Sequence, residues 1–354
     1  MRHILALALA LSWSSLAAQV YDTLVWADEF NYNGSLDTSK WWHQTQLPNG
    51  VSWWNGEIQH YTDRDTNTHC DSGYMHLVAL KETFTDQNYT TQYTSARLNS
   101  KFAFTYGRVE VKAQLPNGIG TWPAIWMLGQ NITELGAYWQ VQGYGTVSWP
   151  YCGEIDIMEH WGSNQNYVSS AIHNPASFGG TQNVGGQYVS GASTGFHLYA
   201  MEWSPTKIVF SVDSVEHYTY EPSIRDSSTW PFDYPQYLLF NTAILPSIDS
   251  AFVSSAMIVD YVRVYQSSTM STLDLEHSAV ELFPNPCQNT LKIRQPFEFA
   301  TLTIIDAQGK ELLCAPLHFG NNEIPVDQLP AGSYTVRILD HESGSASELT
   351  LIKQ

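Results

Sequence analysis

The segment CGEIDIMEHWG, residues 152–162, alternates acidic and apolar side chains as a β-strand does. Successive side chains of a strand point to opposite faces, so Glu154 and Asp156 share one face. Strict alternation would place Glu159 on the apolar face, where a bare carboxylate is costly to bury. A β-bulge near Met158 adds one residue and returns Glu159 to the face of the other acids. The segment therefore predicts a bulged strand with three carboxyl groups on one face.

Carboxyl groups on one face suit the cleavage of a glycosidic bond. Retaining glycosidases place a nucleophile and an acid/base roughly 5–5.5 Å apart. In a regular strand, residues four apart have Cα atoms about 13 Å apart, and a bulge between Glu154 and Glu159 shortens that path. The alternative is an amphipathic strand with a solvated acidic face. Three acids in phase, flanked by tryptophans, favour catalysis.

The sequence E-I-D-I-M-E resembles the bulged signature of the family sixteen glycoside hydrolases, in the form of the laminarinase-type branch. The resemblance implies Glu154 as nucleophile, Glu159 as general acid/base and Asp156 as the carboxylate between them. It implies an endo-acting, retaining β-glucanase that cleaves β-1,3 linkages. Two enzyme alternatives are a mixed-linkage β-1,3-1,4-glucanase and an agarase-like galactanase. A third alternative is a glucan-binding protein without activity.

The composition of the chain excludes several kinds of partner. Its 354 residues include 34 acidic and 16 basic side chains, for a net charge of −18. Nucleic acids and anionic membranes need a basic surface, so neither is expected as a partner. The 13 Trp and 20 Tyr residues suit a sugar polymer, because aromatic rings offer flat apolar faces. We expect a neutral β-glucan as the substrate and no cofactor for catalysis.

Residues 19–266 read as one all-β catalytic domain. Short alternating runs such as 108–114 and 207–213 are separated by turn sequences such as Pro48-Asn49-Gly50. This pattern predicts an antiparallel β-sandwich with a concave cleft. The resemblance makes that sandwich a concanavalin-like jelly roll.

Further segments resemble the family and supply candidate substrate-binding residues. The resemblance places four cleft residues in the segments 55–62, 93–98 and 120–129: Asn55, Arg97, Trp122 and Trp126. His173 ends a strand, 168–173, whose pairing brings it beside the acids. Each has a structural alternative: a turn residue for Asn55, an ion pair for Arg97, core packing for one tryptophan, and a structural or solvated role for His173. The family's Gly-Gly pair after Asn241 is replaced by Thr242-Ala243, so the role of Asn241 is left open.

Residues 130–150 depart from the short form of the family pattern and are rich in aromatic side chains. Loops on a rigid scaffold often tune specificity. We expect this one to shape one end of the cleft.

An acidic residue near the end of the domain is a candidate ligand for a structural calcium ion. In the strand 257–265, alternation places Asp260 on the apolar face with Val262 and Val264, where it needs a partner. The family resemblance implies a calcium site made by the Asp260 carboxylate with the backbone carbonyls of Glu29 and Gly73. An ion pair or a capped turn is the alternative.

The ends of the chain indicate export. Residues 1–18 have the charge, apolar run and small residues of a signal peptide, and no other stretch is apolar and long enough to span a bilayer. Residues 267–276 form a polar linker. Residues 277–354 predict a small β-sandwich that resembles the C-terminal sorting domain of type nine secretion, with Phe283-Pro284-Asn285-Pro286 and L-P-x-G-x-Y at 329–334. A carbohydrate-binding module is the rival, although this tail has few aromatic residues.

The resemblance of the tail implies contact with a secretion machinery. It also implies release from, or anchoring to, a Gram-negative cell. We expect a monomer. The four cysteines are compatible with the pairs Cys70–Cys152 and Cys287–Cys314 or with four free thiols.

Overall fold

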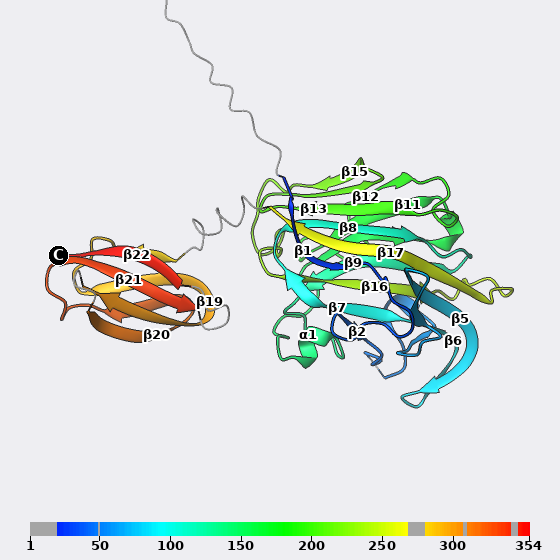
Figure 1. The fold of residues 1–354 in the computed structure, drawn as a ribbon, viewed down its shortest axis with the longest axis horizontal. Coiled ribbons are helices and arrows are strands. Elements are labelled where there is room, and N and C mark those ends of the chain that lie inside the picture. The colour runs from blue at the N-terminus through cyan, green and yellow to red at the C-terminus, as the bar shows by residue number, and fades with distance from the viewer. Residues whose placement is uncertain (1–19, 49, 268–279, 307–309, 341–345) are drawn as a thin grey trace, which may run out of the picture. The chain divides into compact units, whose positions relative to one another are not determined.

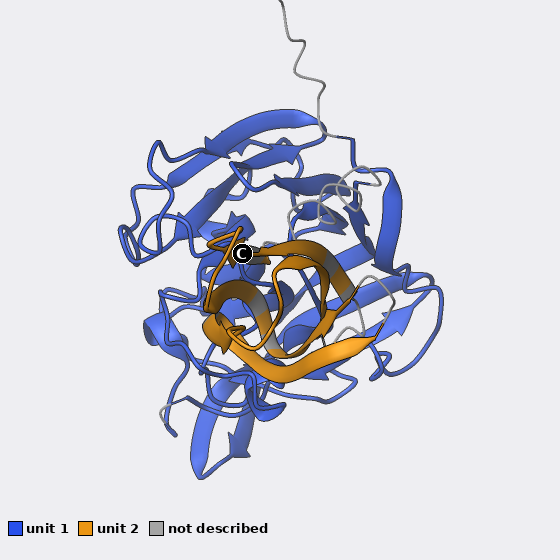
Figure 2. Ribbon diagram, turned by 90° about the vertical axis from the view of Figure 1, so that its left-hand side faces the viewer, with its two compact units in different colours: residues 1–267 blue, residues 268–354 orange. Residues whose placement is uncertain are grey.

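The computed structural model describes residues 20–48, 50–267, 280–306, 310–340 and 346–354, so the expected signal peptide and most of the linker lie outside the described residues. The chain divides into two compact units, residues 1–267 and 268–354 (Figure 2). The first unit has its hydrophobic core between two large β-sheets (Figure 1). This confirms the predicted β-sandwich.

The sheet that carries the acids has seven strands. In spatial order they are β12 (Val184–Tyr188), β11 (Tyr167–His173), β10 (Glu154–His160), β9 (Thr121–Gly129), β16 (Gln236–Ile244), β7 (Arg97–Phe104) and β2 (Trp41–His43). All of its neighbours pair antiparallel. Every residue of β16 is buried, because one face packs in the core and loops cover much of the other.

The second sheet of this unit has ten strands. Its main path is β15 (Val215–Tyr220), β14 (Ile208–Val212), β13 (His197–Trp203), β8 (Gly107–Gln114), β17 (Ser254–Gln266), β5 (Tyr74–Asp86), β6 (Tyr89–Ser95) and β3 (His60–Tyr61), with β1 (Thr23–Asp28) on β17 and β4 (Thr68–Asp71) on β5. Strand β8 shows why such segments are strands: Val109, Val111 and Ala113 are buried, while the residues between them are partly exposed. This period of two buries one face and leaves the other toward solvent.

The helical elements of the described residues are short. They are η1 (Trp54–Gly56), α1 (Tyr138–Val141) and η2 (Gly162–Asn164). Helix α1 lies in the long aromatic loop and packs near β7 and β2 (Figure 1). This loop covers one end of the seven-stranded sheet, where Ile132 and Cys152 form a small apolar cluster with Leu128, Tyr237 and Leu239.

The second unit is a separate all-β body with its own apolar core. Its strands are β18 (Glu281–Phe283), β19 (Thr290–Ile305), β20 (Glu311–Pro325), β21 (Gly332–Asp340) and β22 (Ala346–Lys353). All four cysteines of the chain are free thiols, so the alternative without disulfides describes the structure. No helix among the described residues has the length and apolar character to cross a membrane.

Candidate active site

Strand β10 has the predicted bulge. Asp156 pairs with Trp126 of β9. The next residue of β9, Ile125, pairs with Met158 rather than with residue 157, and Ala124 pairs with Glu159. Ile157 and Met158 are therefore both buried in the core, side by side in sequence. The three acids meet on the opposite face, because five steps along β10 match four steps along β9.

The acids line a cleft of about 860 Å³ on this face of the seven-stranded sheet. All five predicted substrate-binding residues line the same cleft: Asn55, Arg97, Trp122, Trp126 and His173. The alternation of β9 explains the two tryptophans, since positions 122, 124, 126 and 128 share the face of the acids. Sequence segments more than 100 residues apart thus converge on β10.

His173 lies directly across from Glu154 in the pairing of β10 with β11. Its Nε2 is 3.2 Å from Asp156 Oδ2 and 3.6 Å from Glu154 Oε1. Asp156 is only 4% exposed. The imidazole therefore faces two of the three acids and lies within reach of both.

Two tryptophans donate hydrogen bonds to the outer acids. The indole nitrogen of Trp149 lies 3.0 Å from Glu154 Oε2, and that of Trp122 lies 3.1 Å from Glu159 Oε1. Trp122 in turn stacks on Trp161, with ring centroids 5.7 Å apart. Each glutamate thus has one oxygen fixed by an indole N–H and one oxygen free of that bond.

Burial is the main electrostatic influence on the three acids, because it disfavours their charged forms. It raises the pKa of Asp156 to about 8. Burial, with the charge of Asp156, also raises the pKa of Glu159 to about 8, while His173 and Trp122 act in the opposite direction. The pKa of Glu154 is raised by burial and by both neighbouring acids, against His173 and Trp149. The cluster therefore holds fewer than three negative charges at neutral pH.

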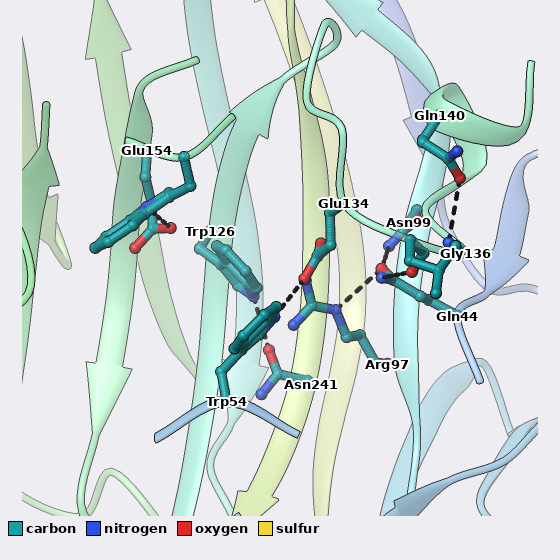
Figure 3. Close-up of polar contacts among 12 residues, drawn as sticks. Gln44, Trp54, Arg97, Asn99, Trp126, Glu134, Gly136, Gln140, Glu154 and Asn241 are labelled. Atoms are coloured by element: carbon teal, nitrogen blue, oxygen red, sulfur yellow. Dashed lines mark hydrogen bonds and ion pairs between the residues drawn. The ribbon is translucent and has the colours of Figure 1, made fainter. Parts of the chain in front are cut away.

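Arg97 occupies the far wall of the cleft and is 4% exposed. Its Nη2 pairs with Glu134 Oε2 at 2.6 Å, and its guanidinium lies 4.8 Å from the ring centre of Trp126. Trp54 donates to the other oxygen of Glu134 at 3.0 Å (Figure 3). Arg97 therefore forms an ion pair, as the structural alternative predicted. Its guanidinium also packs over one face of the Trp126 ring.

A chain of hydrogen bonds fixes the edge of Trp126. Its Nε1 donates to Asn241 Oδ1 at 2.7 Å (Figure 3), and Asn241 Nδ2 donates to the Tyr61 hydroxyl at 3.1 Å. Tyr61 donates to Glu57 Oε2 at 2.9 Å. Asn241, left open in the sequence, thus lines the cleft and holds an indole ring.

Asn55 and the long loop complete the walls. Asn55 lies in η1 with a φ of 58°, so it is both a turn residue and part of the cleft lining. The loop contributes residues 132–135, 148 and 149 to the lining, as expected of a loop that shapes one end. Reasoning from sequence missed Trp54, Glu134 and Trp149 as site residues. Trp54 and Trp149 had a signal, since each is an aromatic residue within six positions of a quoted motif.

The expected calcium ligands lie away from the cleft. Strand β17 pairs with β5 up to Val259 and with β1 up to Val262, so the ends of both strands meet near Asp260. A register shift between Val259 and Tyr261 takes Asp260 out of the core alternation. The prediction that Asp260 shares the apolar face of Val262 and Val264 was therefore wrong.

The side chains at this position already have partners. Asp260 Oδ2 lies 2.9 Å from Lys112 Nζ, and the Glu29 carboxylate pairs with Arg263. Neither pair uses the backbone carbonyls of Glu29 and Gly73. Among the described residues, one group of acids and histidine brings its ligand atoms within 4.8 Å of one another, and it is Glu154, Asp156 and His173 in the cleft.

Two family models and several known proteins are similar to this chain. A family model described as glycosyl hydrolases family 16 matches residues 52–263, and one described as a secretion system C-terminal sorting domain matches residues 281–353. A beta-glucanase of Rhodothermus marinus is 40% identical over 260 residues, which are 69% of this chain and 85% of that protein. The glucan endo-1,3-beta-glucosidase A1 of Niallia circulans is 34% identical, over 69% of this chain and 38% of that protein.

A solved structure is similar as well. The crystal structure of a LamA protein from Z. galactanivorans, in complex with laminaritriose and laminaritetraose, matches with a TM-score of 0.65 and 42% identity. The match covers 70% of this chain and all of that one.

Proposed function

The chain belongs to glycosyl hydrolase family 16, and from this premise we propose that it is an exported, endo-acting β-1,3-glucanase that retains the anomeric configuration. The observation that carries the proposal is the alignment of Glu154, Asp156 and Glu159 on one face of a bulged strand inside a large cleft. An aromatic cleft whose charged lining residues are mostly acidic, in a chain of net charge −18, suits a neutral glucan better than an anionic polymer.

Glu159 is the general acid and then the general base. Its raised pKa, about 8, keeps a proton on the carboxyl group at neutral pH. The Trp122 indole occupies Oε1, which leaves Oε2 to carry the proton toward the leaving oxygen. When the proton is transferred and the glycosidic bond breaks, the Glu159 carboxylate is ready to take a proton from water.

Glu154 is the nucleophile. Its carboxylate attacks the anomeric carbon as the leaving oxygen departs, which gives a glycosyl-enzyme ester. Water, deprotonated by Glu159, then attacks the same carbon and releases Glu154. Burial and the neighbouring acids raise the pKa of Glu154, and His173 and Trp149 oppose that rise, so these two residues favour the ionised form that attack requires.

Asp156 and His173 act on the outer acids. The charge of Asp156 raises the pKa of both Glu154 and Glu159. His173, whose Nε2 lies 3.2 Å from Asp156 and 3.6 Å from Glu154, opposes this effect on both glutamates. The pair therefore sets how many protons the cluster holds when substrate enters.

The proposed function is tested with the variant Glu154→Gln on laminarin, lichenan and agarose. We expect the wild type to release reducing ends from laminarin in preference to the other two. The variant is expected to lose turnover by at least about 10⁴-fold. Its melting temperature should be no lower than that of the wild type. A preferred release of reducing ends from lichenan or agarose would refute the proposed β-1,3 specificity. Glucan binding without any release by the wild type would refute the enzyme.

Export rests on the second unit. Its match to a secretion system C-terminal sorting domain covers residues 281–353. We infer export through the type nine pathway of a Gram-negative bacterium, with residues 1–18 as the signal peptide and a monomer as the active form. Whole-cell fractionation with and without residues 268–354 tests this, since the truncated protein should remain inside the cell.

A structural calcium ion stays a proposal. The Asp260 carboxylate with the carbonyls of Glu29 and Gly73 would hold it, and it would link β17 to the ends of β1 and β5. The ion would compete with Lys112 for Asp260. We expect calcium to raise the melting temperature of the wild type but not of Asp260→Ala. An equal response of both proteins would refute the site.

A further inference from the structure

The cleft face of the sheet continues past the acids onto β11. Ser169, Ala171 and His173 line the cleft, while Val168 and Ile172, which alternate with them along β11, are buried in the core. Tyr167 is two positions before Ser169, so it lies on the cleft face. Its side chain is 39% exposed.

A second tyrosine lies beside it on the edge strand β12. Val184 lines the cleft, and Tyr188 is four positions further along, so both lie on the same face. Tyr188 pairs directly with Tyr167 and is 69% exposed. Directly opposed residues of antiparallel strands have their Cβ atoms about 5 Å apart. The two tyrosine side chains therefore project from adjacent positions on the same face of the sheet.

Gly186 determines how the Tyr167 ring lies. It pairs with Ser169 and shares the cleft face with Val184 and Tyr188. A Cβ added at Gly186 would be 2.6 Å from the Tyr167 hydroxyl oxygen and 2.8 Å from Cζ. The tip of the ring thus lies against the backbone of β12, and any other residue at this position would displace it.

These tyrosines extend an aromatic row that begins inside the cleft. Trp122 and Trp161 stack on each other at the ends of β9 and β10. Trp161 follows His160, which pairs with Val168, so Tyr167 is at the adjoining end of β11. The row therefore crosses four neighbouring strands, from β9 to β12, and passes Glu159.

We propose that Tyr167 and Tyr188 form an aromatic platform that binds the part of the β-glucan chain extending past the cleft over β11 and β12. The proposal rests on the proposed function. Aromatic rings with polar tips suit a neutral sugar chain, whose rings have apolar faces and hydroxyl edges. Continuity with the lining at Ser169 and Val184 places Tyr167 one strand spacing and Tyr188 two strand spacings, roughly 5 and 10 Å, from β10.

The platform is tested by substrate length. In the double variant Tyr167→Ala/Tyr188→Ala, we expect the KM for long laminarin to rise by roughly three- to tenfold, with kcat retained. The KM for a laminari-oligosaccharide short enough to fit in the cleft should not change. Tyr167→Phe/Tyr188→Phe should restore the wild-type KM, because the rings remain. Tyr89→Ala is the matched control, since Tyr89 is 38% exposed on β6 of the other sheet.

Binding separates this proposal from the function on which it rests. In native gels containing laminarin, Glu154→Gln should be retarded, and the same protein without Tyr167 and Tyr188 should be retarded less. Equal retardation, or an equal rise in KM for long and short substrates, would overturn the platform. Dimerisation of the wild type that the tyrosine variants abolish, with KM unchanged, would also overturn it in favour of a contact between two copies. A wild type that leaves laminarin intact would refute the hydrolase instead.

Discussion

Glu159 connects the chemistry of the site to measurable pH dependence. Its pKa is raised to about 8, chiefly by burial, while the Trp122 indole lowers it by favouring the charged form. The enzyme therefore loses activity above about pH 8, as the general acid is deprotonated. In Trp122→Phe the hydrogen bond is lost, so the alkaline limb of kcat/KM should move to higher pH.

A matched control for this shift is Trp54→Phe. Trp54 lines the same cleft but donates to Glu134 rather than to a catalytic acid. Its variant should change KM without moving the alkaline limb. A limb that stays in place in Trp122→Phe, or moves equally in both variants, would contradict the assigned role of Glu159.

The same pKa predicts how folding stability depends on pH. The folded protein keeps the Glu159 proton up to about pH 8, whereas the unfolded chain releases it near the ordinary value of 4.5. The folded state thus binds more protons between these values, and its stability falls as pH rises through them. Glu159→Gln removes this loss. The free energy of unfolding of the variant minus that of the wild type should therefore be larger at pH 9 than at pH 5, by on the order of 2–4 kcal/mol.

Chemical denaturation at both pH values measures this difference, with the exposed Glu221→Gln as control. An identical difference between Glu159→Gln and wild type at pH 5 and pH 9 would show that Glu159 is ionised in the folded protein.

Individual site residues were predictable where a local pattern carried them. The acids, Trp122, Trp126 and His173 follow from strand alternation and from resemblance to a family motif. Glu134 was not predictable, because its partner Arg97 is 37 residues away and no pattern links them. Trp149 was missed because its contact with Glu154 depends on how the preceding loop folds back.

At the scale of the element, the bulge in β10 was predictable because the regular strand would bury a carboxylate. Another bulge, at Asp260 of β17, was not predicted. The sequence there is compatible with a regular strand in which Asp260 is buried with a partner, and also with a bulged strand that places Asp260 outside the core. Only the pairing of β17 with its neighbouring strands decides between these alternatives. Bulges are thus visible in sequence where the unbulged strand has a high energetic cost.

Deleting Met158 tests the bulge. The shortened sequence E-I-D-I-E keeps Glu159 on the face of Glu154 in a regular strand, because the pairing with Leu128 and Ala124 is unchanged. We expect a folded protein with at least about a hundredth of wild-type activity, since small misplacement of catalytic groups costs about 10²-fold. Met158→Ala keeps the length and empties a buried site, so it should lower stability by about 2–4 kcal/mol.

Circular dichroism and reducing-end assays separate the two variants. A deletion variant that folds with the wild-type melting temperature but shows no activity would mean that the bulge itself, and not only the shared face, is needed for catalysis.

At the scale of the whole molecule, composition and turn spacing predicted an all-β chain of two parts. The chain divides at Ser267 and Ser268, inside the expected linker of residues 267–276. The layer order of the sandwich was not predictable from spacing alone, since β16 follows β15 in sequence but pairs with β9 and β7 in the other sheet. Such long-range pairings leave no periodic trace in the sequence.

The separate cores of the two units predict that residues 19–267 fold and act alone. The apolar cluster of the first unit contains only residues of that unit, and the second unit has its own. Truncation after Ser267 should therefore retain kcat, KM and melting temperature within error of the full chain. A truncated protein that aggregates, or that loses activity on a short oligosaccharide, would show that the second unit supports the first.

The most direct test of the central claim is mass spectrometry of the protein after reaction with an activated 2-fluoro laminari-oligosaccharide, which slows hydrolysis of the glycosyl-enzyme. We expect one added glycosyl group, on the peptide that contains Glu154 and at that residue. An adduct on Glu159 or Asp156, or catalytic turnover with inversion at the anomeric carbon and no adduct, would contradict the assignment of Glu154 as the nucleophile of a retaining glucanase.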